Sequence, residues 1–398
     1  MKRILTTFAF IASILSSCIT TQKEDLVIKD FNSISRSVKS EFAPDRRDKT
    51  FEVSIEKTSK GYQILGSTTE AEAKEVLLSK LKEKNIEFED NIVLLPDAEL
   101  GETIYGVVSS SVGSFRYGSN YSAEMATQSL MGTPLRILEK ESYWLRVITP
   151  EGYTAWITEG SVKRMNKTEY DAWKVSKRMV VTDHLTLFRS APNKDADVVM
   201  DGVWGNIVEY MAQKGDYYQV KLPAGQEVFV PSKDVVFFDQ WLASRNPTPA
   251  NIIKQAKQFL GFPYLWGGTS PKAMDCSGFT KTTYFLNGVV LKRDASQQAK
   301  TGENIEITGN FENLEMGDLL FFGSKATAER GERITHVGIY IEDGSFIHCA
   351  TNVKINSLYP NADDYYTGST RLVRAQRMLG NQDKCPGITS IINHPWYL

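Results

Sequence analysis

The chain lacks features that would point to two common classes of function. It has no block of basic residues, and 46 Lys and Arg against 48 Asp and Glu give a formal net charge of −2. Nothing in it therefore indicates a nucleic-acid partner. Its cysteines are few, four in all, and show neither a Cys-x-x-Cys pair nor a Cys/His spacing typical of zinc. We read no metal site from them and expect no cofactor.

The apolar run at the start of the chain is too short to span a bilayer. Met1 to Arg3 is positive, Ile4 to Leu15 is apolar, and Ser16-Ser17-Cys18 ends the run. This layout predicts a secretory signal over residues 1–17. The small residues before Cys18 resemble the lipobox of bacterial lipoproteins, which implies that Cys18 is lipidated. The protein would then be anchored to a bacterial membrane, facing the periplasm or the exterior. An ordinary signal with an incidental Cys18 is the alternative.

Lipidation of Cys18 would leave Cys276, Cys349 and Cys385 in an oxidising compartment. An odd count leaves at least one free thiol there, and we expect that thiol to be Cys276. A Cys349–Cys385 disulfide and two separate buried thiols both remain open, and we favour the second.

At 398 residues the chain is too long for one ordinary core, and its 41% hydrophobic and 24% charged residues exclude wholesale disorder. Residues 18–35 are polar and predicted to form a tether. Residues 36–100 are predicted to form a small α+β domain without visible chemistry. Its expected elements are strands at 51–55, 62–65 and 92–95 and a helix over 71–84.

An internal repeat follows, in which Arg116 matches Arg189 at an offset of 189 − 116 = 73 residues. The same offset relates Gly132 to Gly205, Trp144 to Tyr217, Val147 to Val220, Gly152 to Gly225, Trp156 to Phe229 and Ile157 to Val230. Each copy consists of short β segments between Gly, Pro and Asp turns, which predicts a small β-barrel. Both copies resemble bacterial SH3-like domains, expected over 101–166 and 177–240.

Asn246-Pro247-Thr248-Pro249 is a linker signal. It precedes an amphipathic helix over 250–260. We expect a catalytic domain over 248–380 and an uninformative tail over 381–398.

Residues 275–279, Asp-Cys-Ser-Gly-Phe, place Cys276 in the first turn of a predicted helix. A thiol becomes a useful nucleophile only as thiolate, which a helix N-terminus and an imidazole both favour. The helix dipole contributes only about 0.3–1 kcal/mol, which is less than one pKa unit. An adjacent imidazole must supply the rest. Taken alone, Cys276 would be interpreted as a buried structural cysteine.

His336 and His348 lie on two predicted strands joined through Asp343 and Gly344. A two-residue turn would put the histidines on opposite faces of the sheet, because side chains alternate along a strand. A three-residue connection, with Gly344 left-handed and a bulge, would pair Gly338 with His348 and put both imidazoles on one face. We predict this second register, with both histidines facing Cys276. His336 would then be general base and acid, and His348 would fix its tautomer. The alternative is two ordinary strand histidines.

Asp-Cys-Ser-Gly-Phe (275–279), Gly-Asp-Leu-Leu-Phe-Phe (317–322), Thr-His-Val-Gly-Ile-Tyr (335–340) and Ile-His (347–348) together resemble the NlpC-type cell-wall cysteine peptidases. The resemblance implies a papain-like α+β catalytic domain at the C-terminus of a multidomain α+β chain with two SH3-like barrels. It also implies hydrolysis of peptide bonds in bacterial peptidoglycan stems. The arrangement of two SH3-like domains before the catalytic domain resembles that of one subgroup of these peptidases. That subgroup cuts the γ-D-glutamyl–diamino acid bond of fragments with a free N-terminal L-Ala.

Further residues take roles from the resemblance alone. The Tyr264 hydroxyl would stabilise the oxyanion, and Asp275, Ser277 and Ser296 would bind substrate. Glu124 and Tyr153 would close the pocket from the first SH3-like domain, and Trp266 would wall it. A buried carboxylate at Glu124 would pair with the alanine ammonium. Glu124 as a solvated loop carboxylate, Tyr153 as a core residue and Trp266 as a packing residue remain open.

Two other functions remain as alternatives. One is a same-fold amidase or acyltransferase with another acyl substrate, and the other is a non-catalytic lipoprotein that binds the cell wall. We expect peptidoglycan stem peptides as partners and see no sign of a required protein partner.

Overall fold

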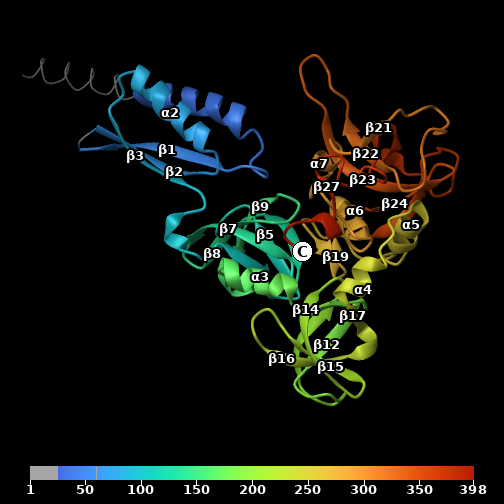
Figure 1. The fold of residues 1–398 in the computed structure, drawn as a ribbon. Coiled ribbons are helices and arrows are strands. Elements are labelled where there is room, and N and C mark those ends of the chain that lie inside the picture. The colour runs from blue at the N-terminus through green and yellow to red at the C-terminus, as the bar shows by residue number, and fades with distance from the viewer. Residues whose placement is uncertain (1–25, 60) are drawn as a thin grey trace, which may run out of the picture. The chain divides into compact units, whose positions relative to one another are not determined.

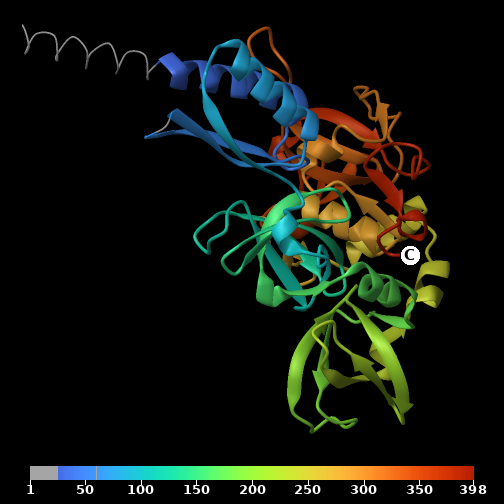
Figure 2. The ribbon, with the colours of Figure 1, turned by 60° about the vertical axis from the view of Figure 1, so that its left-hand side comes forward.

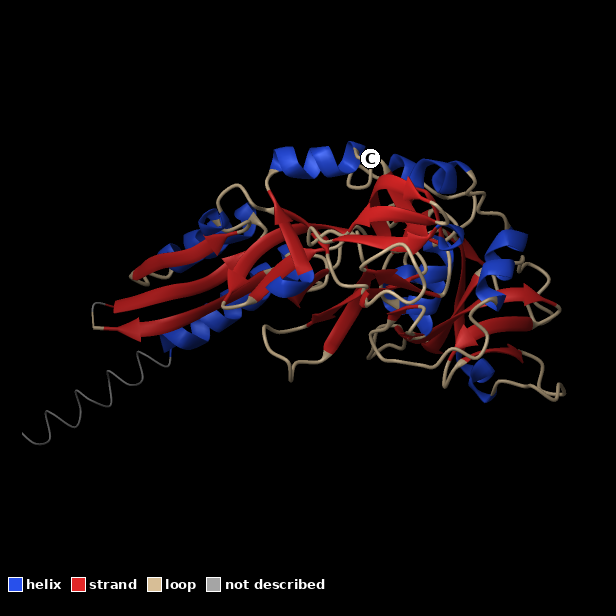
Figure 3. Ribbon diagram, turned by 90° about the horizontal axis from the view of Figure 1, so that it is seen from below, coloured by secondary structure: helices blue, strands red, loops and turns tan. Residues whose placement is uncertain are grey.

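The computed structural model describes residues 26–59 and 61–398. The predicted signal peptide and Cys18 lie outside these residues. The chain falls into two compact units that divide between Glu99 and Leu100, and each is described by itself (Figure 1). Helices and strands of both units are distinguished by colour in Figure 3. In the part of the chain that the structure describes, no helix is long and apolar enough to cross a membrane.

The first unit is a three-stranded sheet with two helices. Its elements are a helix over the described residues 26–42, β1 (Phe51–Thr58), β2 (Gly61–Thr68), α2 (Ala71–Glu83) and β3 (Phe88–Leu94). The strand order is β1-β2-β3, with β1 and β2 antiparallel and β2 and β3 parallel. Both helices share one core with the sheet, to which Val38, Leu77 and Ile64 contribute. The small α+β fold expected here is present.

The predicted tether over 18–35 is wrong from residue 26 onward. Residues 26–42 are helical, and Phe31 is buried in the core of the first unit. Phe31, Ile34 and Val38 recur at helical spacing, so one face of this polar segment is apolar enough to pack.

Two seven-stranded sheets open the second unit. The first repeat comprises β4 (Tyr105–Val108), β5 (Val112–Arg116), β6 (Met125–Leu130), β7 (Pro134–Glu141), β8 (Trp144–Ile148), β9 (Thr154–Thr158) and β10 (Val162–Met165). The second repeat comprises β11 (Arg178–Val181), β12 (Leu185–Arg189), β13 (Val198–Val203), β14 (Ile207–Lys214), β15 (Tyr217–Lys221), β16 (Glu227–Pro231) and β17 (Val235–Phe237). Helix α3 (Lys167–Val175) joins them, and α4 (Phe238–Ala243) follows.

The internal repeat is confirmed in the strand order. It runs β10-β4-β7-β8-β9-β5-β6 in the first repeat and β17-β11-β14-β15-β16-β12-β13, its equivalent, in the second. Arg116 pairs with Trp156 in the first repeat, and Arg189 pairs with Phe229 in the second. These are the two positions that the 73-residue offset relates. Equivalent residues therefore occupy equivalent places in the two sheets.

The remainder of the second unit is a six-stranded sheet with helices (Figures 1 and 2). The strand order is β21-β26-β22-β23-β24-β25. The strands are β21 (Glu303–Ile305), β22 (Leu319–Ser324), β23 (Arg333–Glu342), β24 (Ser345–Cys349), β25 (Val353–Ser357) and β26 (Leu372–Arg377). The helices are α5 (Pro249–Lys257), α6 (Cys276–Phe285) and α7 (Ala295–Gln298). Short strands complete it: β18 (Thr269–Ser270), β19 (Ala273–Met274), β20 (Val289–Leu291) and β27 (Ile388–Ser390).

Alternation along the strands gives this sheet two packed faces. Val337, Ile339 and Ile347 share a core with Cys276 and Phe279 of α6. Other residues of the same strands form a second core: Leu320, Phe322, Tyr340 and Phe346. Because strand side chains alternate with a period of two, the central strands are buried on both faces. Buried hydrophobic strands are rigid supports for a site.

The segment 381–398, expected to be an uninformative tail, is packed into the second unit. β27 pairs with β20, and Ile391 and Tyr397 are buried. The Tyr170 hydroxyl donates to the carbonyl of Trp396, and Arg178 donates to the carbonyl of Tyr397. The residues of this segment that make contacts do not recur at helical or strand spacing, so the sequence pattern did not predict that the segment packs.

Candidate active site

Cys276 is the first residue of α6, as the sequence predicts. Asp275 caps the helix, and its carboxylate accepts from the Gly278 N–H at 2.7 Å. A Cβ at Gly278 would lie 1.9 Å from the Gly268 carbonyl oxygen, so only glycine fits there. The motif therefore has a local structural cause: cap, cysteine and close approach of the preceding loop.

Asp275 is also half of a buried ion pair that sequence reasoning missed. Arg293 donates from Nη1 and Nη2 to its two carboxylate oxygens at 3.1 and 2.6 Å. Arg293 also donates to the hydroxyls of Ser277 and, from the first repeat, Thr127. Burial alone would lower the pKa of Arg293, but the Asp275 charge outweighs it and raises that pKa. Asp275 and Ser277, expected to contact substrate, are thus also parts of the scaffold under Cys276.

The register of the two histidine strands is as predicted, but the turn is not. Gly338 pairs with His348, whereas Glu342 pairs with Ser345, so the connection is a two-residue turn. Asp343 and Gly344 both have positive φ, 46° and 75°. The expected three-residue connection is therefore wrong. A bulge between Tyr340 and Glu342 supplies the extra residue instead, and it restores the pairing that puts both histidines on one face.

The two imidazoles form a hydrogen-bonded relay that continues to Asn356. His336 Nε2 lies 2.7 Å from His348 Nδ1, and His348 Nε2 lies 2.9 Å from Asn356 Oδ1. The Asn356 amide nitrogen donates to the Asp364 carbonyl, so the oxygen faces His348. His348 therefore donates from Nε2 and accepts at Nδ1, and His336 donates from Nε2. This tautomer leaves Nδ1 of His336 as a free acceptor. The sequence carries no signal for Asn356 beyond its position on a strand beside His348.

The thiol environment departs from the expectation. Burial, and after it the Asp275 charge, raises the pKa of Cys276 to about 12, although the Val337 backbone N–H faces the sulfur and favours the thiolate. Burial likewise lowers the pKa of His336 to about 3, with the neighbouring His348 adding to it, and that of His348 to about 4. The predicted lowered thiol pKa is wrong. Burial penalises each charge separately, which favours a neutral thiol and neutral imidazoles. The histidine rings lie against Phe322 and Phe346, and that both face Cys276 stays a prediction.

This electrostatic state predicts a pH dependence of thiol alkylation. Only the thiolate reacts, so a thiol pKa near 12 makes the rate with iodoacetamide rise about tenfold per pH unit from pH 6 to 9. The measurement uses residues 19–398 with Cys385→Ala, in which the other remaining thiol, Cys349, is 0% exposed and protected from the reagent. A rate that levels off below pH 7 would instead show a thiolate already formed.

Two tyrosines flank the thiol and the imidazoles. Tyr264 is half-buried, and burial followed by the Cys276 charge raises the pKa of its hydroxyl, which stays protonated and able to donate. The Tyr366 ring lies 4.9 Å from that of His348 and 5.8 Å from that of His336, measured between centroids. Sequence reasoning missed Tyr366, which lies in a loop without motif character.

The first repeat contacts the catalytic part through two residues that the sequence singled out. Trp266 is 61% exposed and donates from Nε1 to Glu124 Oε1 at 2.9 Å. Glu124 is itself exposed, so the expectation of a buried carboxylate there is wrong. It lies on the loop before β6.

The second contact is buried. The Tyr153 hydroxyl lies 2.7 Å from that of Tyr117 and donates to Asp294 Oδ2 at 3.2 Å. Tyr153 also belongs to the core of the first repeat, so its reading as a core residue is confirmed, and its role in closing the pocket stays a prediction. Asp294 was missed, although it directly follows Arg293. Ser296 is half-buried on α7, two residues further on.

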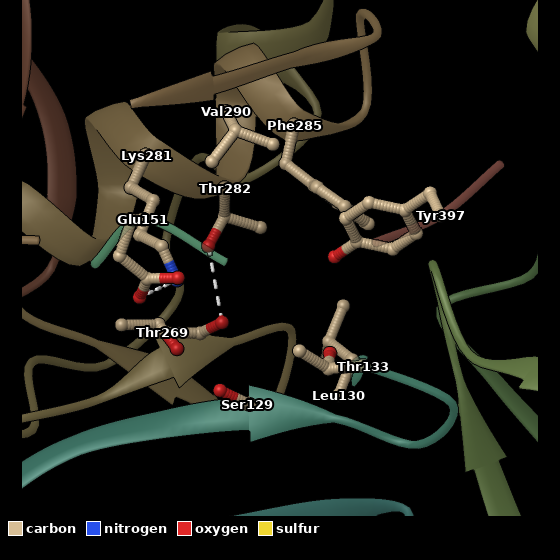
Figure 4. A pocket seen from close by; sticks show the side chains of 10 residues that line it. All are labelled: Ser129, Leu130, Thr133, Glu151, Thr269, Lys281, Thr282, Phe285, Val290 and Tyr397. Carbon is tan, nitrogen blue, oxygen red and sulfur yellow. Dashed lines mark hydrogen bonds and ion pairs between the residues drawn. The ribbon is translucent and has the colours of Figure 1, made fainter. Parts of the chain in front are cut away.

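A small cavity lies between the first repeat and α6, away from every predicted site residue (Figure 4). Its volume is about 30 Å³, which is room for a water molecule or two. Its lining includes the ion pair Glu151–Lys281. Among the described residues, Cys276, Cys349 and Cys385 are free thiols. The favoured separation of Cys349 and Cys385 is confirmed, but of these two only Cys349 is buried. Residues 26–59 and 61–398 contain no group of three or more His, Cys, Asp or Glu placed to hold a metal ion.

Comparisons with known proteins agree with the resemblance. The profile of the NlpC/P60 family matches residues 261–374, and that of the bacterial dipeptidyl-peptidase Sh3 domain matches residues 116–162. The gamma-D-glutamyl-L-lysine dipeptidyl-peptidase of Bacillus cereus is 30% identical over 265 residues, 62% of this chain and 75% of that protein. Its namesake from Bacillus subtilis is 30% identical over 232 residues, 56% and 71% of the two chains. A solved NlpC/P60 family protein from Bacillus cereus shares the fold, with a TM-score of 0.57 at 23% identity over 69% of this chain and 99% of that one.

Proposed function

Because the chain belongs to the NlpC/P60 family of cysteine peptidases, we propose that it hydrolyses the γ-D-glutamyl–L-diamino acid bond of peptidoglycan stem peptides. Its substrates would be fragments with a free N-terminal L-Ala. The observation that carries the proposal is the relay from Asn356 through His348 to His336. His336 lies on β23, and this strand packs against the helix that begins with Cys276. The names of the two Bacillus relatives support the bond.

The relay defines the first chemical step. Nδ1 of His336 takes the proton of Cys276 as the sulfur attacks the γ-carbonyl carbon, so charge appears only during attack. The Tyr264 hydroxyl and the Cys276 backbone N–H donate to the oxyanion that forms. His348 accepts from Nε2 of His336 and stabilises the imidazolium. The absence of a preformed thiolate suits this order, because the proton moves together with bond formation.

Two further steps complete the cycle. The imidazolium gives its proton to the departing diamino acid nitrogen as the C–N bond breaks, which leaves a thioester on Cys276. His336 then takes a proton from water, whose oxygen attacks the thioester carbon. The C–S bond breaks, the thiol regains its proton, and the γ-carboxyl product leaves.

The first repeat supplies the basis for choosing the free N-terminus. Glu124 is held against Trp266, and Tyr153 is held against Asp294, so two carboxylates lie where the first repeat meets the catalytic part. An ammonium group can pair with such carboxylates, whereas the lactyl amide of an attached stem carries no charge. Glu124 is exposed, and a single ion pair at an exposed carboxylate contributes about 0–1 kcal/mol.

Residues 19–398 are expected to cleave L-Ala-γ-D-Glu-diamino acid peptides and to cleave the N-acetylated form more slowly. Cys276→Ala abolishes cleavage, and Cys385→Ala, the matched thiol control, does not. Glu124→Gln raises KM for the free peptide about 2–5-fold and leaves the N-acetylated peptide unchanged. Chromatography of the products measures both effects. Equal cleavage of both peptides by the unmodified chain would contradict the role of Glu124, and no cleavage of either would contradict the proposed bond.

We also propose that Cys18 carries the lipid that holds the protein to the cell envelope. Lipid chains on a terminal cysteine anchor a protein stably when at least two are present. The full chain expressed in bacteria is expected to partition into the detergent phase, and Cys18→Ala is expected to partition into the aqueous phase. Aqueous partition of the full chain would rule out the anchor.

A further inference from the structure

Tyr153 lies at the end of a tight turn of the first repeat, between β8 and β9. The Thr149 N–H donates to the Tyr153 carbonyl at 3.0 Å, and the Gly152 N–H donates to the Thr149 carbonyl at 2.8 Å. Gly152 has a φ of 78°, which favours glycine. These bonds make Thr149–Tyr153 a compact unit. Whatever fixes the middle of this turn therefore also fixes Tyr153.

The middle of the turn carries a buried ion pair to the catalytic helix. Glu151 Oε1 lies 2.8 Å from Nζ of Lys281, with side-chain exposures of 2% and 14% (Figure 4). Lys281 lies on α6 five residues after Cys276, about 7.5 Å along the helix axis. Burial alone would raise the pKa of Glu151, but Lys281 outweighs it and lowers that pKa. The carboxylate is thus charged, and one end of the pair lies on the same rigid helix as the nucleophile.

Two other contacts hold the same turn. Nε2 of His394 donates to the Pro150 carbonyl at 3.0 Å, and the Tyr153 hydroxyl donates to Asp294. All three partners come from outside the first repeat. A buried ion pair contributes little net stability compared with apolar side chains of the same size, because both charges lose water. What the pair adds over an apolar contact is a close approach of two specific charged atoms, at 2.8 Å.

We propose that Glu151 and Lys281 are positioning residues, which hold Tyr153 and the adjoining face of the first repeat at a fixed place relative to Cys276. This inference rests on the proposed function for its effect on substrate. Neither residue touches the reacting atoms. The pair acts through the Thr149–Tyr153 turn at one end and through α6 at the other, and it determines how well the N-terminal part of the peptide is held.

The test is the double variant Glu151→Gln/Lys281→Met, which removes both charges and keeps both shapes. Single variants would leave one buried charge without its partner and unfold easily. The matched control is Asp201→Asn/Lys272→Met, because Asp201 and Lys272 form a 2.7 Å ion pair between the second repeat and the catalytic part, away from Tyr153. Residues 19–398 of the unmodified chain, the double variant and the control variant are compared in cleavage of the L-Ala-γ-D-Glu-diamino acid peptide.

The double variant is expected to raise KM about tenfold and to keep kcat within threefold, because binding is lost equally from the ground and transition states. The alkylation rate of Cys276 stays unchanged. Hydrogen exchange of the Gly152 and Tyr153 amides accelerates at least tenfold. The control variant changes none of these. Wild-type KM together with wild-type exchange in the double variant would overturn the inference, as would an equal change in the control.

The two proposals fail in different ways. If the unmodified chain cleaves no peptide, the proposed function is wrong, and hydrogen exchange alone then decides the role of the pair. If the unmodified chain cleaves the peptide but exchange in the turn is unaffected by the double variant, the positioning role is wrong and the proposed function stands. A purely stabilising role would lower the melting temperature without changing KM.

Discussion

Replacement of His336 by Gln is expected to lower kcat/KM by about 10⁴-fold while the protein still folds. General acid–base catalysis by a positioned side chain contributes about 10²–10⁴-fold, and loss of a member of a catalytic triad is at the upper end of this range. Burial raises the pKa of the Cys276 thiol, which disfavours a preformed thiolate and makes the dependence on His336 stronger. Peptide cleavage under pseudo-first-order conditions measures the loss.

The relay predicts graded losses further from the thiol. His348→Gln is expected to cost about 10²-fold, because His336 loses the group that fixes its tautomer. Asn356→Leu removes one hydrogen bond, about 1 kcal/mol, and so costs about fivefold. Nitrogen-15 shifts of the imidazoles report the tautomer directly, and Asn356→Leu is expected to mix the tautomers of His348. Equal losses in all three variants, or an unchanged tautomer in Asn356→Leu, would contradict the relay.

Local patterns predicted the parts of this site that local physics determines. The cap residue and the close glycine approach place Cys276 at the start of α6, and both are visible in residues 275–279. The pairing of Gly338 with His348 was predicted because it puts both histidines on one face of the sheet, and it is present. The turn itself was mispredicted, since an even turn with a bulge and an odd turn produce the same register. Sequence alone does not distinguish them.

Groups that meet only in three dimensions were not predictable. Arg293 reaches Asp275 across 18 residues of chain, and Asn356 reaches His348 from the next strand. Their partners depend on how separate elements pack. The prediction of a lowered thiol pKa was wrong for the same reason. The sequence shows the helix and the imidazole, but it does not show that burial outweighs their effect on the pKa of Cys276. The hydrogen bond between Glu124 and Trp266 likewise depends on the packing between the first repeat and the catalytic part.

The buried pair under the nucleophile leads to the second large effect. Arg293→Met is expected to reduce the free energy of unfolding by about 3–5 kcal/mol, because it leaves the Asp275 carboxylate buried without its partner. The Arg293 side chain is 1% exposed and that of Asp275 is 9% exposed, so water can replace neither. A loss of this size lowers the melting temperature by about 10 °C. Thermal unfolding followed by circular dichroism measures it.

The double variant Arg293→Met/Asp275→Asn distinguishes the effect of the unpaired charge from the effect of lost side-chain packing. Asparagine caps a helix about as well as aspartate, so α6 keeps its first turn while both charges disappear. Most of the lost stability is therefore expected to return. The control is Lys140→Met, which breaks the exposed pair with Glu159 at 2.7 Å and is expected to cost under about 1 kcal/mol. If the double variant is as unstable as Arg293→Met, the loss comes from packing of the long side chain, and the helix cap at Cys276 does not depend on the charge of Asp275.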